Sequence, residues 1–218
     1  MTRTQDAFPR VHDLILLSSA RVDAACIAEP PWVGLALRRT PWVVVRRAPA
    51  PHGKLAVGIR GTAREQRWGG LLELSQVTLT RKPTQLRSSL ACDSRRTLPV
   101  IKALTFVETT LAHTEFDWGP AGSVGFELAS GYPAAREGSD LDLVLFAPQR
   151  IDPNTARDLW LSLAASPARI DLRVETPVCS FSLEEYVRPE STEILVRLPA
   201  GPRLVEDPWA FPDQRDPQ

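Results

Sequence analysis

The sequence predicts an α+β fold built from two modules, a smaller strand-rich basic module followed by a small mixed sheet with flanking helices. Short apolar runs between prolines and glycines fill the first half, whereas helical and strand patterns alternate in the second. The 26 basic and 26 acidic side chains cancel over 218 residues. Nevertheless, residues 1–98 carry a net charge of +9 and residues 99–218 a net charge of −9, which indicates modules with different roles.

In the first half, apolar and alternating runs predict strands at 42–47, 55–59 and 76–80. Residues 62–72 are predicted to be helical, because Arg60, Arg64 and Arg67 then recur at helical spacing on one face. The polar, arginine-rich stretch at 84–97 is predicted to be a linker. For Arg60, Arg64 and Arg67 taken singly, an ordinary solvated surface rich in arginine is an equally good explanation.

In the second half, the patterns predict helices at 99–113, from 122, at 153–165 and from 182, and strands at 141–146, 170–174, 194–198 and 203–205. A proline opens the first of these helices, and Asp152 with Pro153 forms a capped start for the third. The predicted domains are therefore 1–90 for the basic module and 91–207 for the second, followed by a C-terminal tail at 208–218.

Composition and cysteine usage narrow the class of protein. No run approaches the roughly 18 apolar residues that cross a bilayer, and the apolar run near the N-terminus lacks a signal-peptide cleavage site. Cys26, Cys92 and Cys179 are odd in number and have no paired spacing. This usage suits a reducing cytoplasm and argues against a zinc site. We expect a cytoplasmic protein without a membrane partner.

Two short motifs of the second half carry candidate chemistry. Gly122-Ser123 precedes a predicted helix, where backbone N–H groups and a hydroxyl can hold a phosphate, although such dipeptides are common in turns. The motif GSDLDL at 138–143 puts Asp140 and Asp142 on one face of a strand. Two carboxylates this close repel unless a cation lies between them, and Mg²⁺ suits such ligands. A solvated strand edge is the competing explanation.

Asp171 lies on the strand predicted one helical crossover after the GSDLDL strand. If the two strands are neighbours, its carboxylate lies beside the same cation. Arg173 and Glu175 share its side of the strand, so an ordinary solvated face explains Asp171 equally well by itself.

Taken together, the Gly-Ser turn, the following helix, S-D-L-D-L and the later strand aspartate resemble the nucleotidyltransferase superfamily of DNA polymerase beta. The resemblance implies that Asp140, Asp142 and Asp171 hold two Mg²⁺ ions, with Mn²⁺ as an alternative. These ions would clamp an in-line displacement that expels pyrophosphate. It assigns the triphosphate to Gly122 and Ser123, makes Ser139 a further substrate-binding candidate, and gives Asp171 the option of accepting the nucleophile's proton. The sixteen residues between Ser123 and Asp140 are more than compact members have.

Longer blocks resemble a narrower family, the phosphoribosyl-dephospho-CoA transferases, which are the holo-acyl-carrier-protein synthases of malonate decarboxylase. The blocks are HDLI at 12–15, PWVVVRRA at 41–48, VGIRGTAREQRWGG at 57–70, and GSVGFELASG at 122–131 followed by GSDLDL. The resemblance implies a triphosphoribosyl-dephospho-CoA donor and, as partner, a serine of the acyl carrier protein subunit of malonate decarboxylase. Arg60, Arg64 and Arg67 would then grip the polyphosphate donor or an acidic carrier.

Two other functions remain open at this stage. A generic nucleotidyltransferase acting on RNA, a protein or a small molecule would keep the same carboxylates. The overall charge of zero argues against nucleic acid as a partner. The basic first half leaves that alternative open. A non-catalytic interaction module is the third reading. Three carboxylates converging on one face argue against it, because their mutual repulsion is unfavourable.

Overall fold

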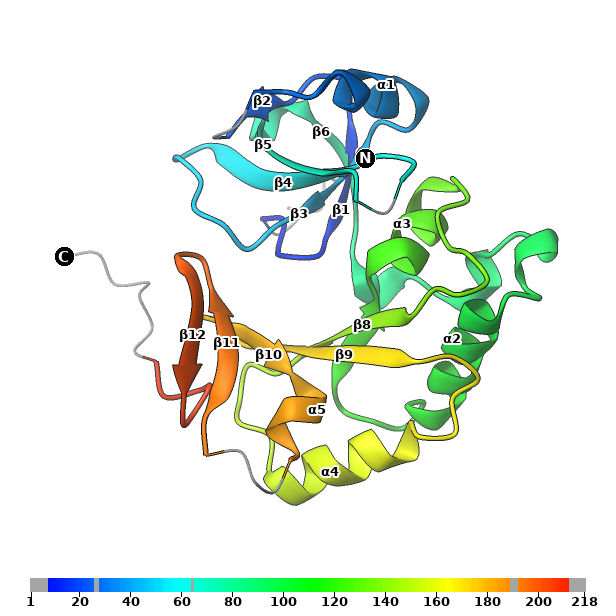
Figure 1. Ribbon diagram of the computed structural model, residues 1–218, viewed down its shortest axis with the longest axis vertical. Coiled ribbons are helices and arrows are strands. Elements are labelled where there is room, and N and C mark those ends of the chain that lie inside the picture. The colour runs from blue at the N-terminus through cyan, green and yellow to red at the C-terminus, as the bar shows by residue number, and fades with distance from the viewer. Residues whose placement is uncertain (1–7, 26–27, 64, 189–191, 212–218) are drawn as a thin grey trace, which may run out of the picture. The chain divides into compact units, whose positions relative to one another are not determined.

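The computed structural model describes residues 8–25, 28–63, 65–188 and 192–211 (Figure 1). Its internal contacts divide the chain into two units, Met1–Lys82 and Pro83–Gln218. The sequence-based boundary after residue 90 falls inside the second unit. The strand-rich first unit, followed by a unit with a mixed sheet and helices, confirms the predicted fold class.

The first unit is a single antiparallel sheet with one helix, in the strand order β2-β5-β4-β3-β1-β6. Its elements are β1 (Leu14–Leu17), β2 (Asp23–Ala24), α1 (Pro31–Arg39), β3 (Trp42–Val45), β4 (Lys54–Arg60), β5 (Arg67–Glu73), the 3₁₀ turn η1 (Leu74–Gln76) and β6 (Val77–Arg81). Pro31 occupies the first turn of α1, where its missing N–H has no intrahelical acceptor to lose.

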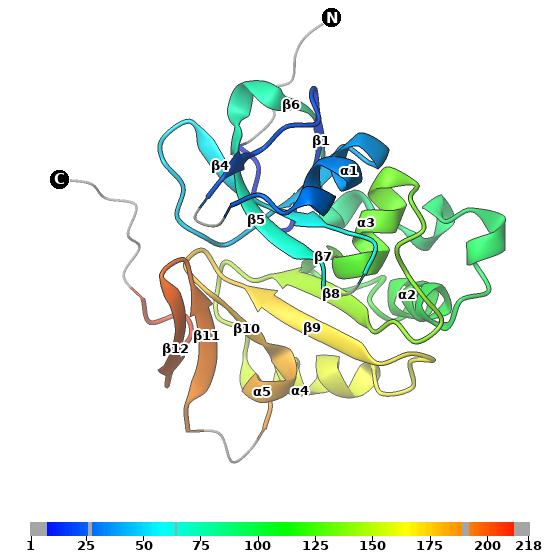
Figure 2. The same ribbon diagram turned by 45° about the horizontal axis from the view of Figure 1, so that its top comes forward.

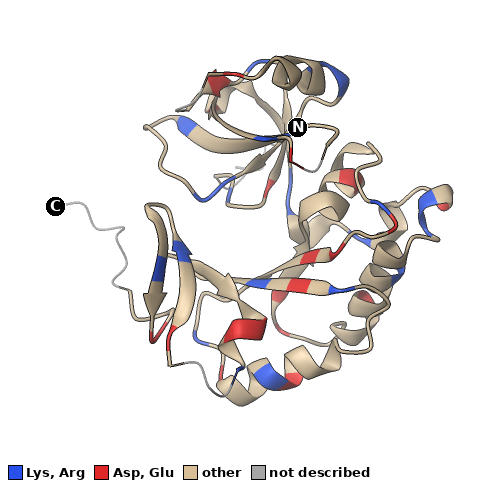
Figure 3. Ribbon diagram, in the orientation of Figure 1, with Lys and Arg blue, Asp and Glu red and all other residues tan. Residues whose placement is uncertain are grey.

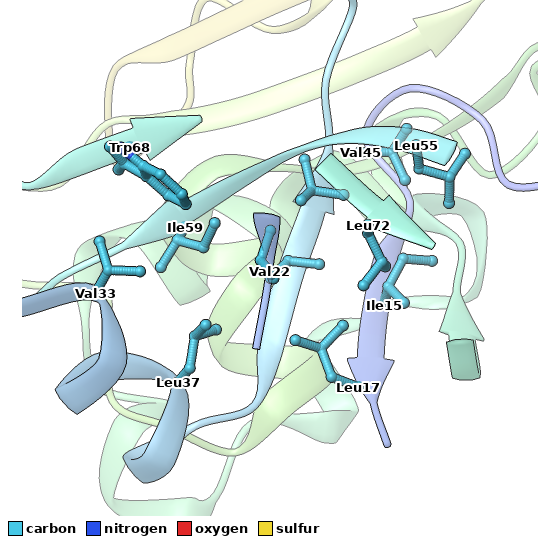
Figure 4. Close-up of a cluster of buried hydrophobic side chains, with 12 residues drawn as sticks. Ile15, Leu17, Val22, Val33, Leu37, Val45, Leu55, Ile59, Trp68 and Leu72 are labelled. Carbon is cyan, nitrogen blue, oxygen red and sulfur yellow. The ribbon is translucent and has the colours of Figure 1, made fainter. Parts of the chain in front are cut away.

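Its core lies between α1 and one face of the sheet (Figure 4). Val33 and Leu37 of α1 meet Val57, Ile59 and Trp68 of the central strands, and all five are almost fully buried. Side chains in a strand alternate between faces, so the residues between these core positions point to the opposite face of the sheet.

The predicted helix at 62–72 is wrong, because its second half is strand β5. Trp68, Gly70 and Leu72 are buried while the residues between them are more exposed, which is the two-residue period of a strand. Gly69 and Gly70 also disfavour a helix interior. The arginine spacing that suggested a helix is therefore coincidental, and Arg64 lies outside the described residues.

The second unit is a mixed sheet in the order β12-β11-β10-β9-β8-β7. Its elements are the 3₁₀ turns η2 (Pro83–Gln85), η3 (Ser88–Leu90) and η4 (Asp93–Arg95), then α2 (Pro99–Thr110), β7 (Asp117–Pro120), α3 (Gly122–Ser130), β8 (Leu141–Phe146), α4 (Pro153–Ser162), β9 (Ile170–Glu175), β10 (Ser180–Ser182), α5 (Leu183–Tyr186), β11 (Ile194–Leu198) and β12 (Gly201–Val205). Among the strands that the structure describes here, only β8 and β9 are parallel, with α4 in their connection. In both views α3 lies on the opposite side of this sheet from α4 and α5 (Figures 1 and 2).

The stretch at 84–97 is not the predicted linker but part of the second unit. Leu86 is only 1% exposed, and the Ser88 N–H donates to Glu108 Oε1 of α2 at 2.7 Å. A Cβ on Gly119 of β7 would overlap the backbone of Pro83, so the two segments approach closely. Polar contacts hold much of this stretch, among them Ser88 to Glu108 and Arg95 to Glu127, so its composition resembles that of a linker.

The region predicted as a tail from residue 208 contributes to the second unit up to residue 211. Trp209 Nε1 donates to the carbonyl of Ala147 at 3.1 Å. Its ring packs edge-on against Phe181 and Tyr186, with centroids 5.1 and 5.5 Å away. Residues 212–218 lie outside the described part of the chain.

Candidate active site

Asp142 and Asp171 lie directly opposite each other on the parallel strands β8 and β9. The sequence-based interpretation required these strands to be neighbours, and they are. On the other face, Leu141 and Leu143 are buried, as the alternation predicted. Both aspartates are partly exposed, with 46% of the Asp171 side chain accessible. Acidic positions accordingly lie side by side on these two strands in Figure 3.

Asp140 immediately precedes β8 and is partly buried. It lies two residues before Asp142 in the sequence, outside the strand itself. The neighbouring Ser139 hydroxyl accepts the backbone N–H of Arg136 at 2.9 Å. The structure therefore gives Ser139 a part in the turn that leads into Asp140.

Gly122 brings the start of α3 against the carboxylate of Asp142. Its φ of 55° is in the left-handed region, and a Cβ at this position would overlap that carboxylate. The Ala121 N–H donates to the backbone carbonyl of Asp142 at 2.8 Å, and Ala121, the residue before α3, gives the helix no side-chain cap. The first N–H groups of a helix lack intrahelical acceptors and favour an anion. Gly122 and Asp142 thus lie against each other, and Ser123 follows Gly122 in α3.

A buried ion pair that the sequence analysis missed supports this site. Arg95 Nε donates to Glu127 Oε1 at 2.8 Å, and Arg95 Nη2 donates to Glu127 Oε2 at 3.1 Å. Glu127 Oε2 also accepts the N–H groups of Ala134 and Ala135, both at 2.8 Å. This Arg95–Glu127 clamp holds the segment after α3, which leads to Asp140. The only signal in the sequence was a glutamate inside the apolar run VGFELAS.

The clamp keeps Glu127 ionised although it is only 5% exposed. Burial by itself would raise the pKa of this carboxyl. The hydrogen bond from Arg95 and those from the Ala135 and Ala134 amides outweigh burial, and the pKa is lowered.

Arg173 adds positive charge to the aspartate face. Its Nη2 lies 3.9 Å from Asp171 Oδ2, and 21% of its side chain is exposed. Sequence reasoning treated it as an ordinary surface residue. In the structure Arg173 lies two residues after Asp171 on β9, on the same face of the strand. A guanidinium at this position can bind a phosphate that is held by the two aspartates.

The donor set fits a magnesium ion that arrives with a phosphorylated substrate. Within the described residues, no three His, Cys, Asp or Glu side chains gather closely enough to enclose a metal ion. Mg²⁺ is commonly held by one or two carboxylates together with substrate phosphates. Asp142 and Asp171, side by side near the start of α3, offer that incomplete set.

A cavity of about 500 Å³ lies elsewhere in the second unit. Its lining includes Trp160, Ala164, Pro167, Arg169 and Glu184, from α4, the loop that follows it and α5. None of the three candidate aspartates is among its lining residues. The aspartate site is therefore an open sheet face rather than this hollow.

The remaining predicted site residues belong to the first unit. Arg60 and Arg67 are directly opposite each other on the antiparallel strands β4 and β5. They therefore share one face of a sheet, rather than the helical face that the spacing suggested. The structure does not describe Arg64.

Comparisons with known proteins cover almost the whole chain. Residues 10–83 match the N-terminal domain model of phosphoribosyl-dephospho-CoA transferase MdcG, and residues 85–208 match its C-terminal domain model. No solved structure matches. In the described part of the chain, no helix combines the length and apolar character that crossing a membrane requires.

Curated relatives with the name phosphoribosyl-dephospho-CoA transferase agree with the models. A Pseudomonas putida protein is 38% identical over 205 residues, covering 93% of this chain and 96% of its own length. A Pseudomonas aeruginosa protein is 38% identical, with 93% and 95% covered, and one from Azotobacter vinelandii is 34% identical, with 92% and 94% covered. The chain belongs to the phosphoribosyl-dephospho-CoA transferase family of enzymes.

Proposed function

We propose that this enzyme transfers the phosphoribosyl-dephospho-CoA group from 2′-(5″-triphosphoribosyl)-3′-dephospho-CoA to a serine of the malonate decarboxylase acyl carrier protein, and that it does so in the cytoplasm. The match of both units to one transferase family is the observation that carries the proposal. The serine oxygen would attack the α-phosphorus of the triphosphate. The bond from that phosphorus to the β-phosphate oxygen would break, and pyrophosphate would leave.

The residues around the β8–β9 pair supply what this displacement needs. The start of α3, at Gly122 and Ser123, would hold phosphate oxygens through its N–H groups. Arg173 would neutralise charge on the departing phosphates. Asp171, with its partly exposed carboxylate, would accept the proton of the carrier serine.

Asp140, Asp142 and Asp171 would hold Mg²⁺ together with the phosphates of the donor, and Mn²⁺ would be an acceptable substitute. When bound, the metal would supply charge neutralisation for an in-line displacement, in the two-metal manner of the DNA polymerase beta-like nucleotidyltransferases. The support for this assignment is the in-register aspartate pair and its closeness to the helix start. The assignment to that superfamily is part of the proposal.

Intact mass of the carrier protein tests the reaction directly. Full-length enzyme, Mg²⁺, the triphosphoribosyl donor and the apo carrier subunit are mixed, and the carrier is weighed. We expect a gain of one phosphoribosyl-dephospho-CoA unit. Asp142→Asn keeps the size of the side chain but removes its charge, so the rate should fall at least about a hundredfold.

Asp158→Asn is the matched control, because Asp158 is exposed on α4, on the opposite side of the sheet from α3. It should transfer at the wild-type rate. Full transfer by Asp142→Asn would contradict the site. In a parallel reaction with nucleoside triphosphates in place of the donor, addition of a nucleotide monophosphate to the carrier, with no transfer from the triphosphoribosyl donor, would keep the chemistry but reject the donor, and it would favour a general nucleotidyltransferase.

A further inference from the structure

The first unit gathers three arginines on the sheet face opposite its core. Gly58 pairs with Gly69, and Arg60 pairs with Arg67, on the hairpin of β4 and β5. Arg46 follows β3, and its N–H donates to the carbonyl of Ala56 at 2.8 Å. Paired residues and residues two apart share a face, so all three arginines lie on the face that α1 does not cover.

Two glycines open the surface beneath Arg46. A Cβ on Gly69 would overlap the guanidinium of Arg46, and a Cβ on Gly58 would lie 3.1 Å from the Arg46 Cδ. The Arg46 side chain therefore lies flat across β4 and reaches β5. This places its guanidinium one same-face position from Arg67, about 7 Å along the strand.

The described carboxylates of the same sheet do not neutralise Arg46 or Arg67. Lys54 Nζ forms ion pairs with both Asp23 and Glu73, each at 2.9 Å. Within the described residues, Arg46 and Arg67 have no ion-pair partner, and both are exposed. Like charges held this close repel, and a bound polyanion would relieve the repulsion.

We propose that Arg46, Arg60 and Arg67 form a phosphate-binding site on the first unit, which we call the arginine platform. Guanidinium forks match phosphate oxygens in pairs, and three of them from the neighbouring strands β3, β4 and β5 suit a compact polyphosphate better than an extended acidic surface. That this ligand is a phosphorylated part of the transferase's substrates rests on the proposed function. The sequence pointed to Arg60 and Arg67, and the structure brings Arg46 to the same face.

Binding of inorganic tripolyphosphate to the full-length protein in EDTA tests the platform without the magnesium site. Calorimetry would compare the wild type with Arg46→Gln and Arg67→Gln, each expected to weaken binding about tenfold or more. Gly69→Ala, which displaces the Arg46 side chain but keeps every charge, should weaken it as well. Arg38→Gln removes an exposed charge from α1, which covers the opposite face, and should leave the affinity unchanged. Circular dichroism would verify the fold of each variant.

Equal weakening by Arg38→Gln and Arg67→Gln would reduce the platform to general electrostatics and overturn the proposal. Unchanged affinity in Arg46→Gln and Arg67→Gln would overturn it too. If these two variants lost only carrier-protein binding, the arginines would bind an acidic protein surface, and the proposal would also be overturned.

The transfer assay separates this proposal from the enzymatic one. Normal tripolyphosphate binding by the arginine variants, with transfer abolished in Asp142→Asn, would reject the platform alone. Weakened binding, with full transfer by Asp142→Asn, would reject the aspartate site alone.

Discussion

At the scale of single residues, Gly122 is required for two reasons, its backbone conformation and the lack of space for a side chain. Its φ of 55° is a conformation that residues with a side chain rarely adopt, and the carboxylate of Asp142 occupies the space a Cβ would need. The backbone of α3 can therefore begin directly against a charged group of β8. A glycine here serves the site as well as the turn.

Gly122→Ala should cost about 1–2 kcal/mol of folding free energy from the backbone conformation alone. It should also displace the Asp142 carboxylate and lower the rate of transfer to the carrier. Melting temperature and intact-mass kinetics measure the two effects. Gly138→Ala is the control, since a Cβ there meets nothing within 4 Å and its φ is not in the left-handed region. Wild-type transfer by Gly122→Ala would show that the position of Asp142 does not matter.

Glu127 predicts a stability change with pH. Its pKa lies below the ordinary value of 4.5, so its ionised form contributes stability above that pH, and the contribution is lost as pH falls through the lowered pKa. Glu127→Gln should destabilise the protein by about 3 kcal/mol at neutral pH, because it leaves Arg95 without its carboxylate. The difference from wild type should shrink below pH 4.5.

Denaturant unfolding at several pH values measures this difference. Glu184→Gln is the comparison, because Glu184 of α5 pairs at 2.7 Å with Arg188 beyond the helix, and both side chains are exposed. That change should be worth only about 0.3–0.5 kcal/mol. A loss in Glu127→Gln that stays constant down to acid pH would contradict the role of the ionised carboxylate.

At the scale of elements, local signals predicted what depends on neighbours in sequence. The alternation of β8 and β9 was clear, and Asp152 Oδ1 caps α4 by accepting the N–H groups of Asn154 and Thr155 at 2.9 and 3.2 Å, as expected. β5 was missed because the arginine spacing fits a helical face, whereas the alternating burial emerges only in the sheet. The Arg95–Glu127 clamp joins residues 32 apart, and no local pattern reveals such a contact.

The 3₁₀ segment before α2 should behave as part of a core. Leu86→Ala should destabilise the protein by about 2–5 kcal/mol, because this side chain is 1% exposed. Leu90→Ala, four residues later and 55% exposed, should change stability by less than about 0.5 kcal/mol. Denaturant midpoints compare the two. If both variants changed the free energy of unfolding equally and only slightly, the segment would be a linker rather than part of the core.

At the scale of the whole molecule, charge is divided between the two units. Met1–Lys82 carries a net charge of +7 and Pro83–Gln218 a net charge of −7. A molecule of net charge zero therefore has a basic unit that attracts polyanions and an acidic unit whose carboxylates need cations. This division suits an enzyme that handles a polyphosphate and a divalent metal together.

Salt should weaken capture of the donor more than it slows the chemical step. The Debye length falls from about 30 Å at 0.01 M to about 8 Å at 0.15 M, so we expect KM for the donor to rise several-fold over this range while kcat changes little. Steady-state kinetics at constant Mg²⁺ measure both. The rise should be shallower in Arg67→Gln and unaltered in Arg38→Gln. A KM independent of salt would argue against electrostatic capture.

The parallel pairing of β8 and β9 also links activity to folding. Asp142 and Asp171 become neighbours only after the chain has passed through α4 and returned to the sheet, so their proximity is a long-range contact. Contacts of this kind close slowly during folding. No short peptide from this protein can reproduce the aspartate pair. During refolding, return of transfer activity should therefore report completion of this strand pairing, later than the return of helical circular dichroism.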